Sequence, residues 1–569
     1  MNNNDVVKVL NHIGLLLELK GESFFKSKAY YDAANKIEIL EEDINNIVSE
    51  NRLSSYKGFG KALTQKITEL VTTGKLDYYN KLKETIPEGL TYMLKISGLG
   101  PKKVKVLYET LGIENIEQLK QACENNKLVN LPRFGQKTQN KILEGIKNIE
   151  VYSQKFHYPI AKLMADEVIK EFEHIDYINR YSIAGSLRRK KEIIKDIDIL
   201  ASSNNPEKVM DLFVSQKYVK EITGKGETKS SVVFQNNIKA DLRVVSDEQY
   251  PYALHHFTGS KEHNTALRHI AKKQNIKMNE YGLFRDDILI KCKSEEDIYN
   301  VFGMDYIPPE LRENYGELEA ASNHQLPTLI TKEDIKGALH VHTIYSDGNA
   351  TIEQLVKACI DKGYNYLGIS DHSKTAIYAR GLSEETIKRQ HEEIDRLNEK
   401  YKDFHIMKGI ESDILSDGEL DYSDNILESF DFIIGSVHSL FKMDEDKMTN
   451  RIVKAIRNKH MKILGHPTGR ILLNREGYKL DINKIINECI DNDVVLEINA
   501  NPYRLDLDWR HMKSAKEKGA KFIISPDAHS VKELNYMIYG INVARKGWLE
   551  EYDVINTLSI ENINRYFLK

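Results

Sequence analysis

Apolar runs of strand length recur through the last part of the chain, and each gives way to turn residues. In chain order they read GALHVHTIYSD, YLGISDHS, HIMKGIES, DFIIGSVHS, KILGHP and FIISPDAH. In a β/α barrel, the ends of such strands form the catalytic rim. The pattern therefore predicts a barrel with chemically active residues gathered at one end.

The residues at these strand ends are of kinds that bind metal ions. They are His340, His342, Asp347, His372, Glu411, His438, His466, Asp527 and His529. A single histidine at a strand end is more often a hydrogen-bonded structural residue. However, residues 319–569 hold 11 of the 18 histidines and residues 1–318 only 7, so the enrichment follows the pattern.

Imidazole and carboxylate ligands without thiolate suit Zn²⁺ or Mn²⁺, and a bridging carboxylate lets two or three ions share one cavity. Clustered ions activate a bound water and stabilise both oxygens of a phosphoryl displacement. We therefore expect a multinuclear site that hydrolyses phosphoesters.

The N-terminal pattern is helical. MNNNDVVKVLNHIGLLLELKGE predicts an amphipathic helix that lacks the features of a signal peptide. YKGFGKALTQKITEL and KISGLGPKKVKVLYE share an apolar residue, a G-x-G turn and a lysine-bearing helix, and LPRFGQKTQNKILEGI is a looser third copy. Each turn alone could equally be a helix C-cap. Together they predict that backbone N–H groups and helix N-termini hold DNA phosphates.

YSIAGSLRRKKEIIKDIDILAS is the richest segment of the first half. Asp196 and Asp198 lie two apart in a strand-type run, so their carboxylates project from one face, and Asp241 in FQNNIKADLRVVS can supply a third. Such a set suits two Mg²⁺ ions that bring a triphosphate and a 3′-hydroxyl together. A solvated edge strand is the alternative for an isolated Asp-x-Asp, and the adjacent GSLRR turn makes it the weaker one.

Composition and charge exclude several classes of protein. With 569 residues, 41% apolar and 29% charged, the chain should form several soluble domains. Residues 1–318 carry 47 basic and 45 acidic residues, and 319–569 carry 34 and 40, so charge alone does not predict a nucleic-acid partner. Without an apolar run of 18 residues, we expect a cytoplasmic protein with no membrane contact. Its four dispersed cysteines indicate reduced thiols.

The six C-terminal motifs resemble the PHP (polymerase and histidinol phosphatase) domain over about residues 336–569. By that resemblance one metal takes His340, His342, Glu411 and Asp527, a second takes Glu411, His438 and His466, and a third takes His372 and His529 with Asp347 nearby. All nine positions carry a competent ligand, which implies an active site.

The glycine turns resemble helix-hairpin-helix motifs, and GSLRR followed by DIDIL resembles the nucleotidyltransferase superfamily, so residues 1–318 look like a family X DNA polymerase. The resemblance implies that Asp196, Asp198 and Asp241 hold catalytic Mg²⁺ or Mn²⁺, with Asp241 taking the proton of the primer hydroxyl. It implies nucleotide contacts at Gly185, Ser186, Arg189, Phe257, Gly259, Asn264 and Arg268. It implies DNA contacts at Gly58, Gly60, Gly98, Gly100 and Lys102.

Both halves together resemble the bacterial form of this family. The domains that we expect are helical 1–80 and 81–154, an α+β palm at 155–246, a thumb at 247–318, a linker at 319–335 and a distorted β/α PHP barrel at 336–569. The main boundary should fall in the polar, Pro-containing stretch 313–334. The implied function is gap-filling DNA synthesis in base excision repair with 3′–5′ exonuclease and abasic-site endonuclease activity.

The implied partners are gapped or primed DNA, abasic-site DNA and dNTPs, and a monomer is the default. Three positions depart from the family pattern. His256 stands where animal members have Tyr, Lys195 replaces a common Gly, and Lys81 lies near a Schiff-base position without enough support to assign a lyase. Two rivals stay open: a DNA-tethered phosphatase of the histidinol-phosphatase type and an inactive DNA-binding scaffold.

Overall fold

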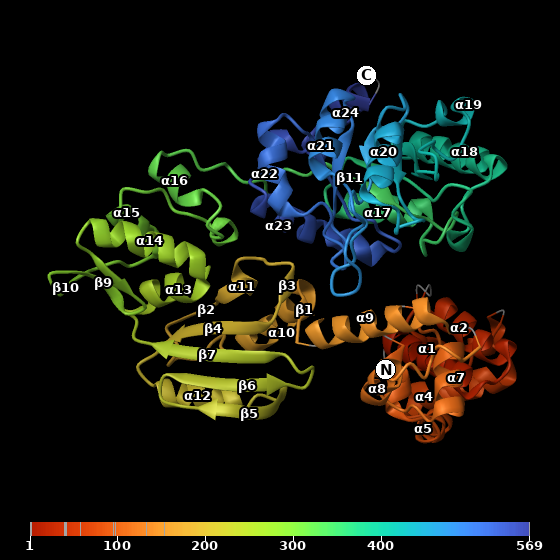
Figure 1. Ribbon diagram of the computed structural model, residues 1–569, viewed down its shortest axis with the longest axis horizontal. Coiled ribbons are helices and arrows are strands. Elements are labelled where there is room, and N and C mark those ends of the chain that lie inside the picture. The colour runs from red at the N-terminus through yellow and green to blue at the C-terminus, as the bar shows by residue number, and fades with distance from the viewer. Residues whose placement is uncertain are drawn as a thin grey trace. The chain divides into compact units, whose positions relative to one another are not determined.

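The computed structural model describes residues 3–38, 42–56, 58–94, 96, 98–132, 134–152 and 154–567. They form two compact units, Met1–Ser153 and Gln154–Lys569 (Figure 1). Lys57, Lys95, Ser97 and Arg133, which belong to the three glycine-turn segments, lie outside the described residues.

The N-terminal unit is helical and has two hydrophobic cores. Its helices are α1 (Asn3–Lys20), α2 (Phe24–Glu38), α3 (Ile44–Ser49), α4 (Lys61–Thr73), α5 (Asp77–Glu84), α6 (Glu88–Met93), α7 (Pro101–Leu111), α8 (Ile116–Glu124) and α9 (Gln136–Tyr152). Gly60 and Gly100 are the N-cap residues of α4 and α7, and Pro101 occupies the first turn of α7, where its missing N–H costs nothing. Each predicted glycine turn therefore leads into a helix.

The palm of the larger unit is a five-stranded sheet in the order β2-β4-β7-β6-β5. The strands are β2 (Arg180–Ile183), β4 (Asp196–Ser202), β5 (Val219–Lys225), β6 (Lys229–Phe234) and β7 (Lys239–Val245). The β4 and β7 pair is parallel, and the others are antiparallel. Apolar residues of the sheet and of helices α10 (Tyr158–Lys170) and α12 (Pro206–Val214) form one hydrophobic core, which supports the strands that carry the aspartates.

The thumb follows directly and has its own core. It contains α13 (Tyr250–Thr258), α14 (Lys261–Lys273), a small antiparallel sheet of β8 (Lys277–Asn279), β9 (Gly282–Arg285) and β10 (Ile288–Ile290), and α15 (Glu295–Val301). Ser260 caps α14 by accepting from His263 N–H, and Ser294 closes a capping box with Asp297 at α15.

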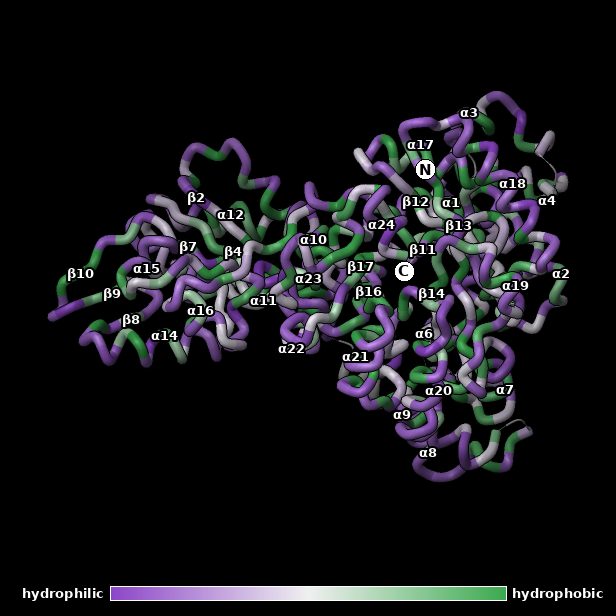
Figure 2. Tube along the Cα trace, turned by 90° about the horizontal axis from the view of Figure 1, so that it is seen from above, coloured by the Kyte–Doolittle hydropathy of each residue, from purple (hydrophilic) through white to green (hydrophobic). Residues whose placement is uncertain are grey.

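The C-terminal domain is the expected barrel. Its strands, all parallel and paired in chain order, are β11 (Gly337–Val341), β12 (Tyr366–Ile369), β13 (His405–Asp413), β14 (Phe432–Ser436), β15 (Ile463–Leu464), β16 (Val495–Asn499) and β17 (Phe522–Ser525). The bridge from Val341 to Ala528 joins the first strand to the segment after the last. Every residue of β11, β14 and β16 is buried, which explains why their sequences are mainly apolar, and hydrophobic stretches run through the barrel strands in Figure 2.

Helices alternate with the barrel strands. They include α17 (Ile352–Asp361), α18 (Glu384–Lys400), α20 (Glu445–Ile456), α21 (Ile482–Asp491), α22 (Trp509–Glu517) and α23 (Met537–Lys546). A capping box between Thr351 and Gln354 starts α17, and the Asp444 carboxylate caps α20. This alternation places the carboxyl ends of the strands at one rim, as the sequence predicted.

The segment 319–335, which we expected to be a linker, packs within the larger unit. Leu329 and Ile330 are buried, and Ile330 N–H donates to the Leu549 carbonyl at 3.0 Å. The chain therefore divides at residue 153 and not within 313–334, because apolar side chains hold the connecting segment against the barrel domain. Among the described residues, none of the helices has the length and apolar character needed to span a membrane.

Candidate metal centres and nucleic-acid contacts

Glu411 lies at the centre of the barrel rim, and histidines from four other strand ends surround it. Its carboxylate is 3.0 Å from His372 Nδ1, 3.0 Å from His466 Nε2 and 3.3 Å from Nε2 of both His340 and His438. His342 Nε2 is 3.6 Å away on the same carboxylate. A single buried glutamate thus faces five imidazoles.

The other three ligand candidates complete a wider group. Asp527 Oδ1 lies 3.4 Å from His342 Nε2 and 3.7 Å from His340 Nε2. Asp347 lies 3.3 Å from His529 Nε2 and 3.7 Å from His372 Nε2. All nine residues predicted at the strand ends are therefore brought together in one cluster.

The spacing fits shared metal coordination. Two ligand atoms that each lie about 2.1 Å from one tetrahedral ion are about 3.4 Å apart, close to the 3.0–3.7 Å found here. Buried nitrogens of His340, His342 and His372 that face these carboxylates have no hydrogen-bond partner. Buried polar atoms rarely stay unpaired, so the donor set fits divalent ions.

Ligand atoms within 4.8 Å of one another fall into four groups in the described part of the chain. The groups are His342, Asp347, His372 and His529; His340, His342 and Asp527; His340, Glu411 and His466; and His372, Glu411 and His438. His438 and His466 thus fall in separate groups, whereas the family resemblance assigned them to one ion. The site offers overlapping positions that share Glu411, His340, His342 and His372.

Carboxylates outside the nine fix the orientation of the ligands. Glu497 of β16 accepts a hydrogen bond from His340 Nδ1 and another, at 2.6 Å, from the His466 backbone N–H. Asp413 accepts from His438 Nδ1 at 2.5 Å. Because a carboxylate can only accept, each Nδ1 carries a proton and each Nε2 faces the centre. Sequence analysis missed both residues, although Asp413 lies two after Glu411 and so on the same strand face.

The pKa values of the buried groups around Glu411 depend strongly on one another. Burial by itself lowers the pKa of His340, but the carboxylates of Glu497, Glu411 and Asp527 raise it well above its ordinary value. Burial lowers the pKa of His342 to about 4, and the neighbouring His529 and His372 act in the same direction. Burial would raise the pKa of Glu411, but the histidines around it hold that pKa well below its usual range. Glu411 is therefore ionised and could serve as a metal ligand.

The palm carboxylates lie on neighbouring strands. Asp198 of β4 and Asp241 of β7 are direct partners in the parallel register, and Asp196 is two residues before Asp198 on the same face. Burial first, then the charges of Asp196 and Asp241, raise the pKa of Asp198 to about 6. Divalent cations would relieve this repulsion, so the three residues fit a cation site.

The palm site is more open than the barrel site. Among the described residues, which include all three aspartates, their carboxylate oxygens form no group that lies within 4.8 Å. Asp241 instead pairs with Lys229 at 2.7 Å and accepts from Ser231 Oγ at 2.6 Å. Asp196 is exposed.

The turn after β2 brings the predicted phosphate contacts beside these carboxylates. Gly185 has φ +59°, and a Cβ there would lie 2.1 Å from Asp198 Oδ2, so only glycine fits. Ser186 follows in the short helix α11 (Gly185–Arg188), and the Arg189 backbone N–H donates to the Gly185 carbonyl at 3.2 Å. The Arg189 Nη1 group donates to the Thr258 carbonyl in the thumb.

Thumb residues surround the same region. Phe257 stacks 4.4 Å from the Arg243 guanidinium, and Asn264 Nδ2 donates to the His256 carbonyl at 2.7 Å. A Cβ on Gly259 would lie 3.0 Å from Arg189 Nη1. Burial lowers the pKa of His256. Asn264 therefore contacts the C-terminal end of α13, and its buried Oδ1 has no hydrogen-bond partner.

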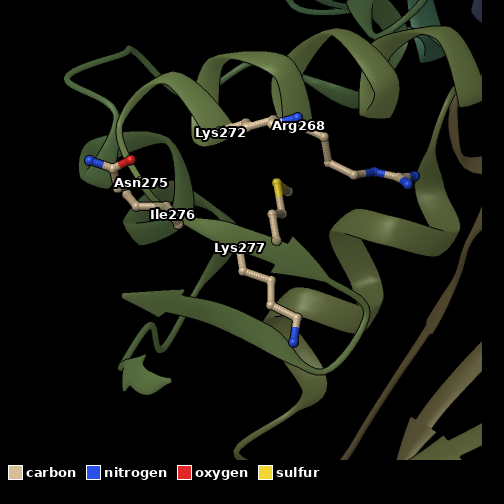
Figure 3. Close-up of a pocket in the computed structure, with 6 residues that line it drawn as sticks. Arg268, Lys272, Asn275, Ile276 and Lys277 are labelled. Carbon is tan, nitrogen blue, oxygen red and sulfur yellow. The ribbon is translucent and has the colours of Figure 1, made fainter. Parts of the chain in front are cut away.

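Arg268 lies one turn further along α14, at a shallow basic pocket of about 480 Å³. Figure 3 shows Arg268 and Lys272 on the helix and Lys277 on the strand beneath, with Asn275 in the turn between. Three cations around one depression are suited to nucleic-acid phosphates.

Two glycine turns of the N-terminal unit expose their backbone. Gly58 and Gly98 have φ of +103° and +86°. A Cβ on Gly60, Gly98 or Gly100 would meet no atom within 4 Å, so this backbone is open to a large ligand. Lys102 lies in the first turn of α7. These turns can present N–H groups to phosphate.

Lys81 has the surroundings of an ordinary surface lysine, with an exposed side chain that pairs with Asp77 at 2.7 Å. Lys66 is different. Its ammonium donates to Tyr30 at 2.6 Å and lies 3.3 Å over the Tyr78 ring, and burial lowers its pKa. Of the two, Lys66 has the environment that favours a neutral, nucleophilic amine.

Family models match four parts of the chain. They are a helix-hairpin-helix domain at 1–76, a SAM-like helix-hairpin-helix tandem at 90–148, a DNA polymerase beta thumb at 253–313 and a PHP domain at 338–501. These matches agree with the helical, thumb and barrel regions described above.

Three curated proteins illustrate the similarity. The DNA polymerase/3′-5′ exonuclease PolX of Bacillus subtilis (strain 168) is 38% identical over 570 residues, covering 100% of this chain and 99% of that protein. The repair DNA polymerase X of African swine fever virus is 32% identical over 22% of this chain and 78% of its own length. A probable phosphatase of Thermoanaerobacter sp. (strain X514) is 28% identical over 38% of this chain and 89% of its own length.

The phosphatase and the viral polymerase each match one part, whereas the Bacillus protein matches the whole chain. The order of domains, the barrel and the thumb agree with that full-length match. This chain therefore belongs to the bacterial PolX family of DNA polymerase/3′-5′ exonucleases, family X polymerases that carry a PHP domain.

Proposed function

We propose that this protein fills short gaps in damaged DNA with its palm and prepares the DNA ends with its barrel. The proposed substrates are gapped or primed DNA and dNTPs for the palm, and 3′ ends and abasic sites for the barrel. The observation that carries the proposal is the convergence of nine metal-type ligands, with Glu411 at their centre, in a chain that also aligns Asp198 with Asp241. A cytoplasmic location is part of the proposal, because bacterial DNA lies there.

In the palm, Asp196, Asp198 and Asp241 would hold Mg²⁺ or Mn²⁺, which neutralise the triphosphate and lower the pKa of the primer hydroxyl. The Gly185–Ser186 turn and the Arg189 guanidinium would bind the β- and γ-phosphates. Asp241, a partly exposed carboxylate, would accept the proton of the 3′-hydroxyl, as the family resemblance implies. Phe257, Gly259 and Asn264 would contact the sugar and base, and Arg268 the minor groove.

In the barrel, the nine ligands would hold up to three ions, with Zn²⁺ or Mn²⁺ the best match for imidazole and carboxylate. Bound ions supply an activated water and neutralise charge on the phosphate. The protein supplies the fixed ligand orientation through Glu497 and Asp413. Arg504, 3.5 Å from Asp527, adds a guanidinium at the edge of the cavity, where it could hold a phosphate oxygen.

The test uses protein purified without chelator and three substrates. We expect incorporation into a one-nucleotide gap, cleavage of an oligonucleotide that bears one abasic site, and 3′–5′ degradation of a primer. Metal analysis of the same preparation should find more than one Zn²⁺ or Mn²⁺ per chain.

A phosphatase of small molecules is the second candidate, because probable phosphatases match the barrel. Release of phosphate from a small phosphomonoester, with abasic DNA left uncut, would support that candidate and contradict the proposed end processing. Absence of incorporation with either Mg²⁺ or Mn²⁺ would contradict the proposed synthesis and favour a DNA-binding scaffold.

A further inference from the structure

Lys546 is a buried lysine of the barrel domain that reaches the phosphate-binding turn of the palm. It is the last residue of α23 and is 1% exposed. Its ammonium donates to the Glu313 carboxylate at 2.9 Å, to the Arg189 carbonyl at 3.1 Å and to the Glu310 carbonyl at 3.2 Å. An ammonium has three donors, and all three are used here, so its position is fixed.

Glu313 connects Lys546 to the side chain of Arg189. The oxygen that accepts from Lys546 also accepts from Arg189 Nε at 3.1 Å, and the second oxygen lies 3.3 Å from the Lys191 ammonium. Burial raises the pKa of Glu313, but Lys546, followed by Arg189 and Lys191, lowers it to about 2. Three basic side chains therefore share one buried carboxylate.

Arg189 is held from two sides. Its Nε group bonds to Glu313 and its Nη1 group to the Thr258 carbonyl. The contacts described for the guanidinium use its Nε and Nη1 groups and leave Nη2 as the edge that would face a ligand. A guanidinium held by two of its edges presents the third in a defined direction.

The barrel, and not the palm, determines where Lys546 lies. Its helix α23 follows the loop that carries Asp527 and His529 and packs on β16 and β17. A Cβ on Gly540 of this helix would come within 2.5 Å of Ile524 and 2.7 Å of Ala500, so helix and strands are in close contact. Such packing leaves little freedom for the helix to shift.

We infer that Lys546 is a positioning residue of the polymerase site, which orients Arg189 for the triphosphate of the incoming nucleotide. It does so by neutralising Glu313, which would otherwise compete with phosphate for the guanidinium, and by fixing the Arg189 carbonyl. The PHP domain is then a working part of nucleotide binding. This inference rests on the proposed role of Arg189 in binding the triphosphate.

The test is Lys546→Met in the full-length protein, with steady-state insertion of one dNTP into gapped DNA. The KM for dNTP should rise roughly five-fold with kcat within about two-fold, because binding charge is lost and the metal ligands are untouched. Affinity for gapped DNA and cleavage by the barrel should stay as in the wild type. Lys546→Gln, which keeps two N–H donors, is the second variant should the methionine disturb folding, and the same rise in KM is expected.

Lys513→Met is the matched control. Lys513 lies on α22, donates to the Tyr315 carbonyl at 3.1 Å and stacks 3.7 Å over Trp548, so it joins the barrel domain to the segment that follows Glu313, and its described contacts do not include Glu313 or Arg189. The KM of the Lys513→Met variant for dNTP should equal that of the wild type. An equal rise in both variants would mean that loosening of the domain contact is the cause, and this would overturn the inference.

A double-mutant cycle isolates the charge effect. In a Glu313→Gln background, Lys546→Met should change the KM by less than about two-fold, because no carboxylate remains to be neutralised. Full additivity of the two effects would overturn the inference. Arg189→Lys distinguishes the proposed role of Arg189 from the inferred role of Lys546. An unchanged KM for dNTP in Arg189→Lys would contradict the role of Arg189. A raised KM in Arg189→Lys together with an unchanged KM in Lys546→Gln would contradict only the inference about Lys546.

Discussion

The barrel and the palm arrange their metal ligands in opposite ways. In the barrel, eight candidate ligands surround the buried Glu411, and the carboxylates of Glu497 and Asp413 fix two of the imidazoles. In the palm, three aspartates share one face of an open sheet, and one of them is exposed. The barrel would therefore bind its ions without a substrate. The palm would need the oxygen ligands of the triphosphate to complete its ion site.

The largest expected effect is the separation of the two activities. Asp198→Ala should reduce nucleotide insertion at least ~10³-fold, because removing a central metal ligand costs about 4 kcal/mol of transition-state stabilisation. Cleavage of abasic DNA should remain within about two-fold of wild type. Gapped-primer extension and abasic-site cleavage, assayed on one preparation, check both statements.

His340→Ala should give the reverse result. His340 contacts Glu411 and Asp527 and belongs to two of the ligand groups, so its loss should reduce DNA cleavage by ~10²-fold or more while insertion continues. If either variant lost both activities with its fold intact, the two centres would not be independent.

Metal content should sharpen the contrast further. Glu411→Gln removes the carboxylate that faces five histidines, so bound metal should fall by more than one ion per chain. His529→Ala, at the rim beside Asp347, should cost at most one ion. Elemental analysis after gel filtration measures both, and equal losses would contradict the central place of Glu411.

Gly185→Ala should impair only the palm. The new methyl group would collide with the Asp198 carboxylate, and φ of +59° is strained for alanine. We expect a loss of insertion of about 10- to 100-fold with normal cleavage, since displaced ligands cost a few kcal/mol. Retention of full insertion would mean that Asp198 can move without consequence.

The smallest effects should come from the helix-hairpin-helix turns. Gly100→Ala has an ordinary φ of −86° and open space around it, so folding stability should not change while affinity for gapped DNA falls several-fold. Gly98→Ala should add a stability cost of about 1 kcal/mol, because its φ is +86°. Titration with gapped DNA measures the affinity, and thermal unfolding measures the stability. An unaltered DNA affinity in both variants would contradict a role of these turns in DNA binding.

Sequence patterns predicted six of the seven barrel strands because apolar runs such as those of β11 and β14 are buried and give way to polar residues, whereas β16, whose run contains Glu497, was not among the predicted runs. They also predicted which side chains would gather at the rim, since parallel strands end together. They misplaced the main boundary, because polar residues around 319–335 concealed the apolar anchors Leu329 and Ile330. They pointed to Lys81 as the candidate Schiff-base lysine. In the structure Lys81 is an exposed lysine paired with Asp77, whereas Lys66 lies against the ring of Tyr78.

The sequence by itself determined the kinds of chemistry this protein carries: the imidazole and carboxylate ligands, the paired aspartates and the glycine turns. Only the tertiary structure decided which groups act together. Glu497, Asp413 and Lys546 each lie in ordinary sequence surroundings, and their importance comes from partners distant in the chain, such as His340 for Glu497 and Glu313 for Lys546. Local pattern reports burial and strand direction, whereas pairing of buried charges depends on contacts that form only when the chain is packed.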